Sequence, residues 1–262
     1  MEKRPEHPHT IPLKQKIPMP ASFETTANVY GYPNLPERFE RAVLLVDKPS
    51  GWTSFDVIRK LRGLLSHAAG TSVRKIGHTG TLDPMATGLL ICLIGRATKE
   101  MEAFMGLPKT YEGTLRLGEV TPSYDAETDV GERRAWQHLT QADLEAARQV
   151  FLGLITQRPP MYSAVKVGGE RLYKKARRGE QVERPTRQVR IDAFTLTGWE
   201  GPDVSFHVRC SKGTYIRSLA HDLGQRLGVG AHLVALRRTA IGPHQIAEAW
   251  TIDQLETVLR RG

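Results

Sequence analysis

The segment Gly77-His78-Thr79-Gly80-Thr81-Leu82-Asp83-Pro84-Met85-Ala86-Thr87-Gly88 is the stretch around which the chain is organised. Its three glycines and one proline predict a shaped loop instead of a helix or strand. The apolar run Leu89–Ile94 that follows is typical of a strand buried on both faces. The loop therefore presents a histidine, His78, and a carboxylate, Asp83, from the end of a rigid element, as catalytic scaffolds do.

Local chemistry leaves two interpretations of these side chains open. Asp-Pro is a common turn dipeptide, and Pro84 biases the backbone of Asp83 toward extended or turn geometry. A single histidine such as His78 is more often a structural residue than a catalytic one. The pattern alone therefore describes Asp83 either as a turn former or as a reactive carboxylate.

The composition is typical of a soluble globular protein with an ample core: 262 residues, 40% of them hydrophobic and 25% charged. The net charge of +9 favours a polyanionic partner. The two cysteines, Cys92 and Cys210, lie in apolar segments, which favours buried thiols in a reducing cytoplasm over a disulfide. No apolar run approaches the roughly 20 residues of a membrane span, and the N-terminus lacks the apolar core of a signal peptide.

Motifs of several enzyme classes are absent from the sequence. There is no P-loop, no Gly-x-Ser-x-Gly elbow, no His-Glu-x-x-His and no Cys-x-x-Cys. A dinucleotide fingerprint beginning at Gly228 is incomplete, because Leu233 stands at the third glycine position. We expect no metal and no cofactor, and the absence of these motifs agrees with that expectation.

Hydrophobic patterning predicts strands and helices on both sides of the central loop. Residues 42–46 form a short apolar strand, and Thr53 or Ser54 begins a helix. The helical spacing of its apolar residues predicts a buried face made of Phe55, Ile58, Leu61 and Leu65. Further strands are predicted at 110–118, 189–196 and 204–210, and further helices from Thr140, after Tyr215 and over 251–260.

Two polar features lie between these elements. The loop 121–131 carries Asp125 and Asp129, but EF-hand spacing is absent, so a solvated acidic loop is favoured over a cation site. Arg217 lies at the start of a predicted helix, where the helix dipole disfavours a cation. This placement predicts an anionic partner for Arg217.

The segment 157–190 is strongly basic. Between residues 166 and 190, nine basic and three acidic side chains contribute +6 to the net charge. A solvated charged face is one explanation, but the interleaved tyrosines favour phosphate contacts combined with stacking on bases or riboses. The expected RNA-binding residues are Lys166, Arg171, Lys174, Lys175, Arg177 and Arg178.

The order of these stretches resembles the motifs of the TruB-type tRNA pseudouridine synthases. The resemblance covers roughly residues 42–242, and the ordered set is more specific than any single motif. The matching stretches are Leu44–Ser54, Gly77–Gly88, Lys109–Tyr111, Pro160–Lys166, Leu172–Gly179, Cys210–Arg217 and Gly228–Thr239.

The resemblance implies an α+β fold: a mixed, mostly antiparallel sheet with flanking helices and a central catalytic cleft. It also implies isomerisation of uridine 55 in the T loop of tRNA to pseudouridine, without a cofactor. Asp83, in the Leu-Asp-Pro of the loop, is then the catalytic nucleophile. The resemblance also implies five substrate-binding residues. His78 helps to hold the flipped nucleotide, and Tyr111 stacks on the target base. Tyr215 lines the pocket, Arg217 pairs with Asp83, and Leu236 forms a pocket wall.

Composition and the resemblance together divide the chain into three parts. Residues 1–40 are expected to be a flexible extension, 41–247 the catalytic domain with an RNA-gripping insertion at about 157–190, and 248–262 a helical tail. A PUA domain is expected to be absent, because only about 20 residues follow Gly242. We expect a cytoplasmic monomer that binds the T stem-loop of tRNA and no membrane.

Two other functions stay open. An RNA-binding module or RNA chaperone fits the basic charge and the aromatic residues equally well. A guide-RNA-dependent member of the same superfamily is the third interpretation, although the insertion and the short chain resemble the stand-alone bacterial form.

Overall fold

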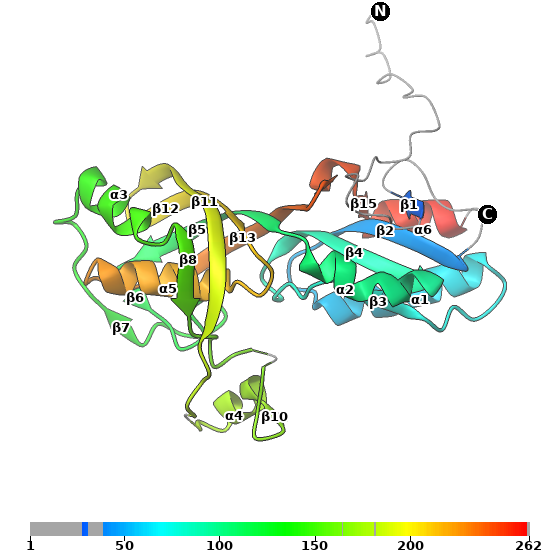
Figure 1. The fold of residues 1–262 in the computed structure, drawn as a ribbon, viewed down its shortest axis with the longest axis horizontal. Coiled ribbons are helices and arrows are strands. Elements are labelled where there is room, and N and C mark those ends of the chain that lie inside the picture. The colour runs from blue at the N-terminus through cyan, green and yellow to red at the C-terminus, as the bar shows by residue number, and fades with distance from the viewer. Residues whose placement is uncertain (1–27, 31–38, 164, 181, 261–262) are drawn as a thin grey trace, which may run out of the picture.

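A computed structural model describes residues 28–30, 39–163, 165–180 and 182–260, and most of the expected N-terminal extension lies outside them. An eleven-stranded, mostly antiparallel sheet runs through the molecule (Figure 1). Its strands are β1 (Asn28–Tyr30), β2 (Arg41–Lys48), β3 (Ile76–His78), β4 (Thr87–Gly95), β5 (Lys109–Leu117), β8 (Gly153–Gln157), β11 (Arg187–Glu200), β12 (Asp203–Cys210), β13 (Ala231–Ile241), β14 (His244–Gln245) and β15 (Trp250–Thr251).

Helices cover the sheet in two separate groups (Figure 1). One group consists of α1 (Ser54–Ala68), η1 (Arg96–Glu100), α2 (Met101–Gly106), η2 (Ile246–Glu248) and α6 (Ile252–Arg260). The other consists of α3 (Gln141–Gln149) and α5 (Ile216–Arg226). The α+β fold with a mostly antiparallel sheet, expected from the resemblance, is therefore confirmed.

The sheet has two halves that meet at β4 and β13. The strand order is β1-β2-β4-β13-β5-β12-β11-β8, and β4 and β13 pair in parallel over only two residue pairs, Arg237 with Thr87 and Arg238 with Gly88. Gly88 has a φ of +104°, and a Cβ there would lie 2.3 Å from the Arg238 carbonyl oxygen. The seam between the halves therefore requires a glycine, and the central loop ends at this seam.

Each half has its own hydrophobic core. Alternate residues of β12 point into the core beneath α3 and α5, as the pattern of residues 204–210 predicts. In the other half, one face of β2 and β4 packs on α1 and α6, and the opposite face packs on Phe104 of α2. Thr53 caps α1 through a capping box with Asp56. The predicted burial of Phe55 is wrong, since this side chain is 61% exposed.

Two further expectations are corrected by the structure. The segment 77–88 is not entirely loop, because His78 ends β3 and pairs with Cys92, and Thr87 begins β4 and pairs with Arg237 of β13. Asp125 is fully buried, so the acidic loop is not simply solvated. Cys92 and Cys210 are buried free thiols, as expected.

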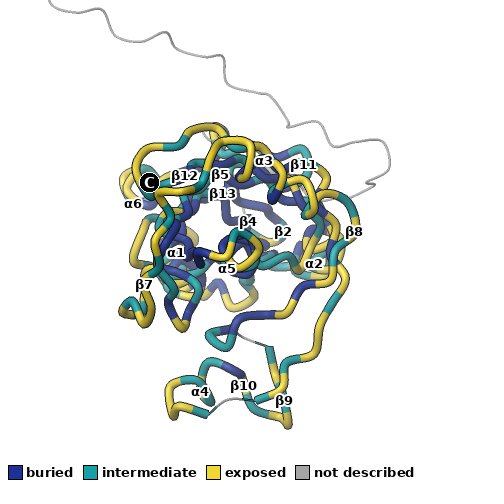
Figure 2. The backbone as a smooth tube through the Cα atoms, turned by 90° about the vertical axis from the view of Figure 1, so that its left-hand side faces the viewer, coloured by how far each residue is buried: buried dark blue, intermediate teal, exposed yellow. Residues whose placement is uncertain are grey.

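The basic insertion projects away from the sheet (Figures 1 and 2). It contains β9 (Lys166–Val167), β10 (Glu170–Arg171) and α4 (Leu172–Arg177), and its surface is mostly exposed or half-buried (Figure 2). A second small hairpin pairs β6 (Glu119–Val120) with β7 (Glu132–Arg133). Among the described residues, no helix is long and apolar enough to cross a membrane.

Candidate active site

The loop that carries Asp83 is held from the side of β2 and α1. The Ser54 hydroxyl accepts a hydrogen bond from the Leu82 amide at 2.8 Å and lies 3.1 Å from the Leu82 carbonyl oxygen. The Gly51 amide donates to the carbonyl of Pro84 at 2.8 Å, and the buried Lys48 ammonium donates to the same oxygen at 3.2 Å. The residues on both sides of Asp83 are therefore fixed by hydrogen bonds, of which those to Leu82 are buried.

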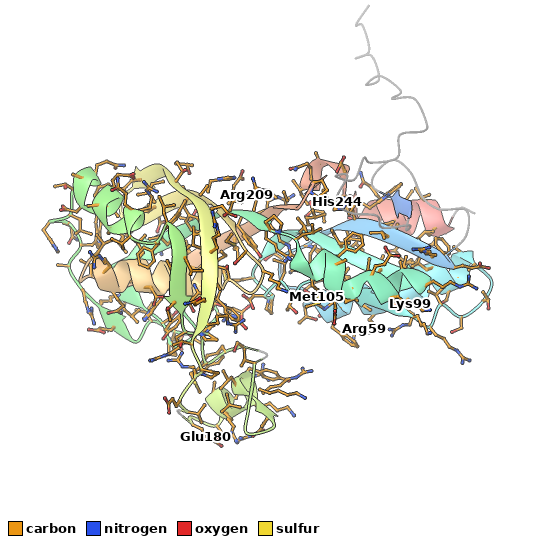
Figure 3. All side chains as sticks on the ribbon, viewed as in Figure 1. Arg59, Lys99, Met105, Glu180, Arg209 and His244 are labelled. Carbon is orange, nitrogen blue, oxygen red and sulfur yellow. The ribbon has the colours of Figure 1, made fainter. Side chains whose placement is uncertain are left out.

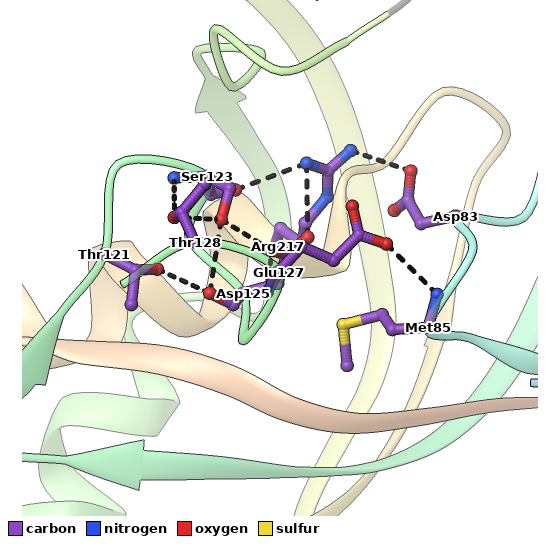
Figure 4. A network of polar contacts seen from close by, with 8 residues as sticks. All are labelled: Asp83, Met85, Thr121, Ser123, Asp125, Glu127, Thr128 and Arg217. Carbon is purple, nitrogen blue, oxygen red and sulfur yellow. Dashed lines mark hydrogen bonds and ion pairs between the residues drawn. The ribbon is translucent and has the colours of Figure 1, made fainter. Parts of the chain in front are cut away.

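Arg217, at the start of α5, reaches across to Asp83 (Figure 4). Its Nη2 lies 2.8 Å from Asp83 Oδ1, although the two residues are 134 positions apart in the sequence. The Arg217 side chain is only 4% exposed, whereas the carboxylate of Asp83 is about one-third exposed. The predicted anionic partner of Arg217 is thus Asp83, which faces accessible space with one side of its carboxylate.

Asp125 is a second carboxylate on the same guanidinium, a role that its sequence context does not predict. Its Oδ2 lies 3.4 Å from Arg217 Nη1, which also donates to the Ser123 carbonyl at 3.2 Å. Asp125 Oδ1 accepts from the Ser123 hydroxyl at 2.6 Å and from the Glu127 amide at 3.0 Å (Figure 4). Neighbouring Tyr124 has a φ of +64°, so an unusual backbone turn places this carboxylate inward.

The electrostatic environment of Asp83 combines opposing effects. Burial raises the pKa of Asp83, Arg217 lowers it, and Asp125 raises it, with a net rise above the ordinary value. Burial also lowers the pKa of Lys48 to about 8, although the charge of Asp83 opposes this. Arg217 is therefore the main group that keeps the carboxylate of Asp83 ionised.

Tyr111 and Leu236 lie on neighbouring strands close to this loop. Tyr111 on β5 pairs with Arg238 of β13, and both Tyr111 and Leu236 are buried in one core cluster with Leu82. Burial raises the pKa of Tyr111. Beneath them, the buried Arg238 donates to the carbonyls of Leu89 at 2.7 Å and Gly80 at 3.0 Å. Arg238 therefore holds the start of the loop in place, a role that its sequence context does not predict.

Tyr215 and His78 are the other two expected substrate-binding residues. Tyr215 precedes α5, and the guanidinium of Arg187 lies 4.8 Å from the centre of its ring. His78 is half-buried at the end of β3, and its Nδ1 is buried without a hydrogen-bond partner among the described residues. Burial lowers the pKa of His78, with Arg238 adding to the effect. The imidazole is therefore neutral at pH 7.

A groove of about 850 Å³ adjoins the loop. It runs over β5, β12 and β13, and Met85, Thr87 and Leu236 are among its lining residues. Its volume lies within the range of ligand-binding clefts. Asp83 is not one of its lining residues, so the groove borders the site without containing the carboxylate.

The six basic residues expected to bind RNA fall into two groups on the insertion. Lys166, Arg171, Lys174 and Arg177 are exposed. Arg178, in contrast, forms a two-point ion pair with Glu170 at 2.7 and 2.8 Å and a further one with Glu180 at 2.7 Å. Lys175 lies 3.4 Å from Glu180, whose position on the projecting insertion is visible in Figure 3. The structure therefore gives Arg178 and Lys175 partners within the insertion.

No cluster of three or more His, Cys, Asp or Glu side chains within the described ranges is arranged to hold a metal ion. The polar groups around Asp83 instead form hydrogen bonds and ion pairs with one another. The arrangement is a carboxylate beside a buried guanidinium, on the loop between β3 and β4. Such a group can act as a nucleophile or as a base toward an electron-poor carbon.

Sequence comparison places the chain among known proteins. The model of the TruB family pseudouridylate synthase N-terminal domain matches residues 69–216, and that of the tRNA pseudouridylate synthase B C-terminal domain matches 217–261. The tRNA pseudouridine synthase B of Opitutus terrae is 51% identical over 82% of this chain and 87% of that protein. The enzyme of the same name from Flavobacterium johnsoniae is 44% identical over 86% of this chain and 98% of that protein.

Solved structures give a consistent result at lower similarity. A chain of a Cbf5–Nop10–Gar1 complex is 31% identical with a TM-score of 0.62, covering 82% of this chain and 54% of that chain. A chain of an H/ACA RNP bound to a substrate RNA containing 2′-deoxyuridine is 29% identical with a TM-score of 0.58, covering 80% of this chain and 51% of that chain. This protein spans only about half the length of those solved chains. By its sequence over most of its length, the chain belongs to the TruB family of pseudouridylate synthases, which are isomerases.

Proposed function

We propose that the protein isomerises uridine 55 in the T loop of tRNA to pseudouridine, by flipping the base and using Asp83 as the nucleophile, without a cofactor. The observation that carries the proposal is the 2.8 Å contact between Asp83 and the buried Arg217. The names of the curated relatives, tRNA pseudouridine synthase B, support tRNA as the substrate.

The chemistry suits a single carboxylate. The bond between ribose C1′ and uracil N1 breaks, the base turns, and a bond forms between C1′ and C5. C5 then loses a proton and N1 gains one, so the reaction has no net oxidation or reduction. Asp83 either attacks C1′ or removes the proton at C2′, and both first steps need it in the ionised form that Arg217 favours.

The surrounding side chains provide the pocket for the flipped base. Tyr111 stacks on the uracil, and Leu236 of the neighbouring strand forms a wall. Tyr215 lines the pocket beside Arg217, and neutral His78 helps to hold the extruded nucleotide. The burial of Tyr111 and Leu236 in the same cluster as Leu82, next to Asp83, supports this placement.

The partner is the T stem-loop of a tRNA, bound by a monomer in the cytoplasm. The exposed cations of the insertion contact its phosphates, and their position on a projecting element supports this role. The catalytic domain spans residues 41–247, and the described residues after it contain β15 and α6.

The test is incubation with an unmodified tRNA transcript, followed by mapping of pseudouridine through carbodiimide modification and primer extension. We expect product at position 55 with the wild-type protein. Asp83→Asn should reduce the single-turnover rate by about 10³-fold or more, because it removes the reacting group. Asp129→Asn, which alters an exposed carboxylate of the acidic loop, is the matched control and should keep the rate.

The same experiment separates the other interpretations. Wild-type protein that binds the transcript without forming pseudouridine would favour an RNA chaperone. Product formed only after a second RNA is added would favour a guide-dependent enzyme. The 42–51% identity to curated tRNA pseudouridine synthases, against 27–31% to the Cbf5 chains, supports the stand-alone form.

A further inference from the structure

Gln157 makes an unusual pair of contacts at the point where the insertion leaves the sheet. It is the last residue of β8, and only 1% of its surface is exposed. Its Nε2 donates to the carbonyl of Tyr215 at 2.9 Å, and its Oε1 accepts from the amide of Tyr215 at 2.7 Å. One side-chain amide therefore satisfies both backbone polar groups of Tyr215, as a neighbouring strand would.

Tyr215 is the N-cap residue of α5, and α5 has no side-chain cap of its own. An uncapped helix start leaves amide groups unsatisfied and is prone to fray. Arg217 lies two residues into this start. The Gln157 amide thus anchors the backbone from which the partner of Asp83 extends.

Both strands at the root of the insertion contact the segment 213–218. Directly after one strand, β8, the carbonyl of Arg158 accepts a hydrogen bond from the Ser218 hydroxyl at 2.8 Å. On the other, Arg187 covers the Tyr215 ring and donates to the Gly213 carbonyl at 3.3 Å. The root therefore encloses the start of α5 from two sides, and Gln157 is its buried contact.

We propose that Gln157 is a positioning residue that couples RNA seated on the insertion to the alignment of Arg217 with Asp83. This inference rests on the proposed function. The insertion holds the exposed cations, Gln157 ends the strand from which it leaves, and Tyr215 connects Gln157 to Arg217. A shift of the root moves the guanidinium, and a 2.8 Å contact tolerates little displacement.

The coupling has a signature in the pH dependence of the reaction. Asp83 is faced by Arg217 from α5, by Asp125 and Glu127 from the loop 121–131, and by Lys48 from β2. Loss of the Gln157 contacts loosens only Arg217, the main group that lowers the pKa of Asp83. The pKa of Asp83 should then rise, so that Asp83 loses its proton only at higher pH. The acid limb of the pH–rate profile should move to higher pH with it. A role confined to fold stability would leave this limb in place.

The experiment compares Gln157→Met, Gln157→Glu and Gln188→Met in the full-length chain. Methionine keeps the side-chain length but removes donor and acceptor, and glutamate keeps an acceptor for the Tyr215 amide. Gln188 is exposed on β11 opposite Thr156 of β8, so its variant is the matched control. Single-turnover rates on the tRNA transcript are measured at saturating enzyme across pH, and RNA affinity is measured by filter binding.

For Gln157→Met we expect a rate about ten-fold lower, as for the loss of two buried hydrogen bonds, with the Kd for RNA within about two-fold of wild type. Gln157→Glu should fall between this variant and wild type, and Gln188→Met should match wild type. Circular dichroism reports the folded fraction, and if Gln157→Met does not fold, Gln157→Glu is judged by the same rate and pH criteria.

Two results would overturn the inference: a wild-type rate and acid limb in the Gln157 variants, or a rate loss explained entirely by weaker RNA binding or by the unfolded fraction. Wild-type protein that forms no pseudouridine would instead refute the proposed function. The two failures are therefore distinguishable.

Discussion

At the scale of single residues, one guanidinium connects two carboxylates of very different exposure. Arg217 contacts Asp83, which is about one-third exposed, and Asp125, which is fully buried. Removing one partner from a buried ion pair usually costs more than the pair contributes, because a charge is left without compensation. Arg217 is therefore required both for the fold around the site and for the ionisation of Asp83.

We expect Arg217→Met to reduce the single-turnover rate by about 10²-fold or more and to move the acid limb to higher pH. Burial already raises the pKa of Asp83, and Arg217 is the first group that opposes it. Rates on the tRNA transcript across pH provide the measurement. Arg116→Met, which breaks a half-exposed pair with Asp203, is the control. An acid limb that stays in place in Arg217→Met would contradict this account of Asp83.

The site residues differ in how far the sequence predicts them. Asp83 and Arg217 belong to short motifs, and the position of Arg217 at a helix start already calls for an anion. Asp125 was misjudged because its burial depends on the positive φ of Tyr124 and on a distant helix. Arg238 and Gln157 were missed because their hydrogen bonds go to backbone groups of segments far along the chain.

At the scale of elements, the insertion carries exposed basic side chains and projects away from the sheet. Lys166, Arg171, Lys174 and Arg177 are exposed, and none forms an ion pair with another described residue. Arg178 is held instead by Glu170 and Glu180. The sequence predicted the basic segment, but it did not predict which cations pair internally, because that depends on how β10 and α4 fold together.

Replacing these four exposed cations by alanine should weaken tRNA binding and flatten its salt dependence. Each lost phosphate contact reduces the slope of log K against log salt by roughly 0.7 to 0.9, so four contacts correspond to about 3. Titrations at several salt concentrations test this. Arg178→Ala alone should change the slope of log K against log salt by less than the amount expected for one phosphate contact. An unchanged slope in the fourfold variant would mean that the insertion does not meet the phosphates.

His244 makes the short hairpin of β13 and β14 sensitive to acid. It is fully buried against Phe104, neither ring nitrogen has a partner among the described residues, and burial lowers its pKa to about 4. The unfolded chain, with a pKa near 6.5, therefore binds this proton first as the pH falls. The stabilisation is complete above pH 6.5 and is lost between 6.5 and 4, by about 3 kcal/mol.

We expect His244→Phe to remove this part of the acid dependence. Urea unfolding at pH 7 and pH 4.5 gives the free energies of unfolding, and the difference between the two should be smaller for the variant. His67→Phe, on the exposed end of α1, should keep the wild-type difference. Equal differences in His244→Phe and wild type would show that His244 does not limit stability in acid.

At the scale of the whole molecule, the site exists only because two half-sheets join. Asp83 comes from a loop between strands of one half, and Arg217 comes from a helix on the other. The resemblance implied the sheet and its helices, and the hydrophobic patterns placed most of the strands. The pairing of β4 with β13 was not predictable, because two residue pairs leave no periodic signal. Gly88 is the residue of this junction whose type reflects the pairing, because a Cβ there would clash with the backbone of Arg238.

Gly88→Ala adds only one methyl group, but it should disrupt the pairing of β4 with β13 and lower the free energy of unfolding. A Cβ would meet the backbone of Arg238 at 2.3 Å for its carbonyl oxygen and 2.7 Å for its nitrogen, and the φ of +104° strains any side chain. We expect a loss of about 3 kcal/mol or more in the free energy of unfolding, measured with urea at pH 7.

The rate should fall together with stability in this variant, because β4 follows the loop of Asp83 and β13 carries Leu236. Gly63→Ala within α1 is the matched control: a Cβ there meets nothing within 4 Å, and alanine favours a helix by roughly 0.5–1 kcal/mol. The single-turnover rate of the folded protein then discriminates between two accounts of the seam. If Gly88→Ala loses stability but keeps the wild-type rate, the two halves do not need this junction to align Arg217 with Asp83. If it loses both while Gly63→Ala loses neither, the alignment of the catalytic pair depends on the contact between β4 and β13.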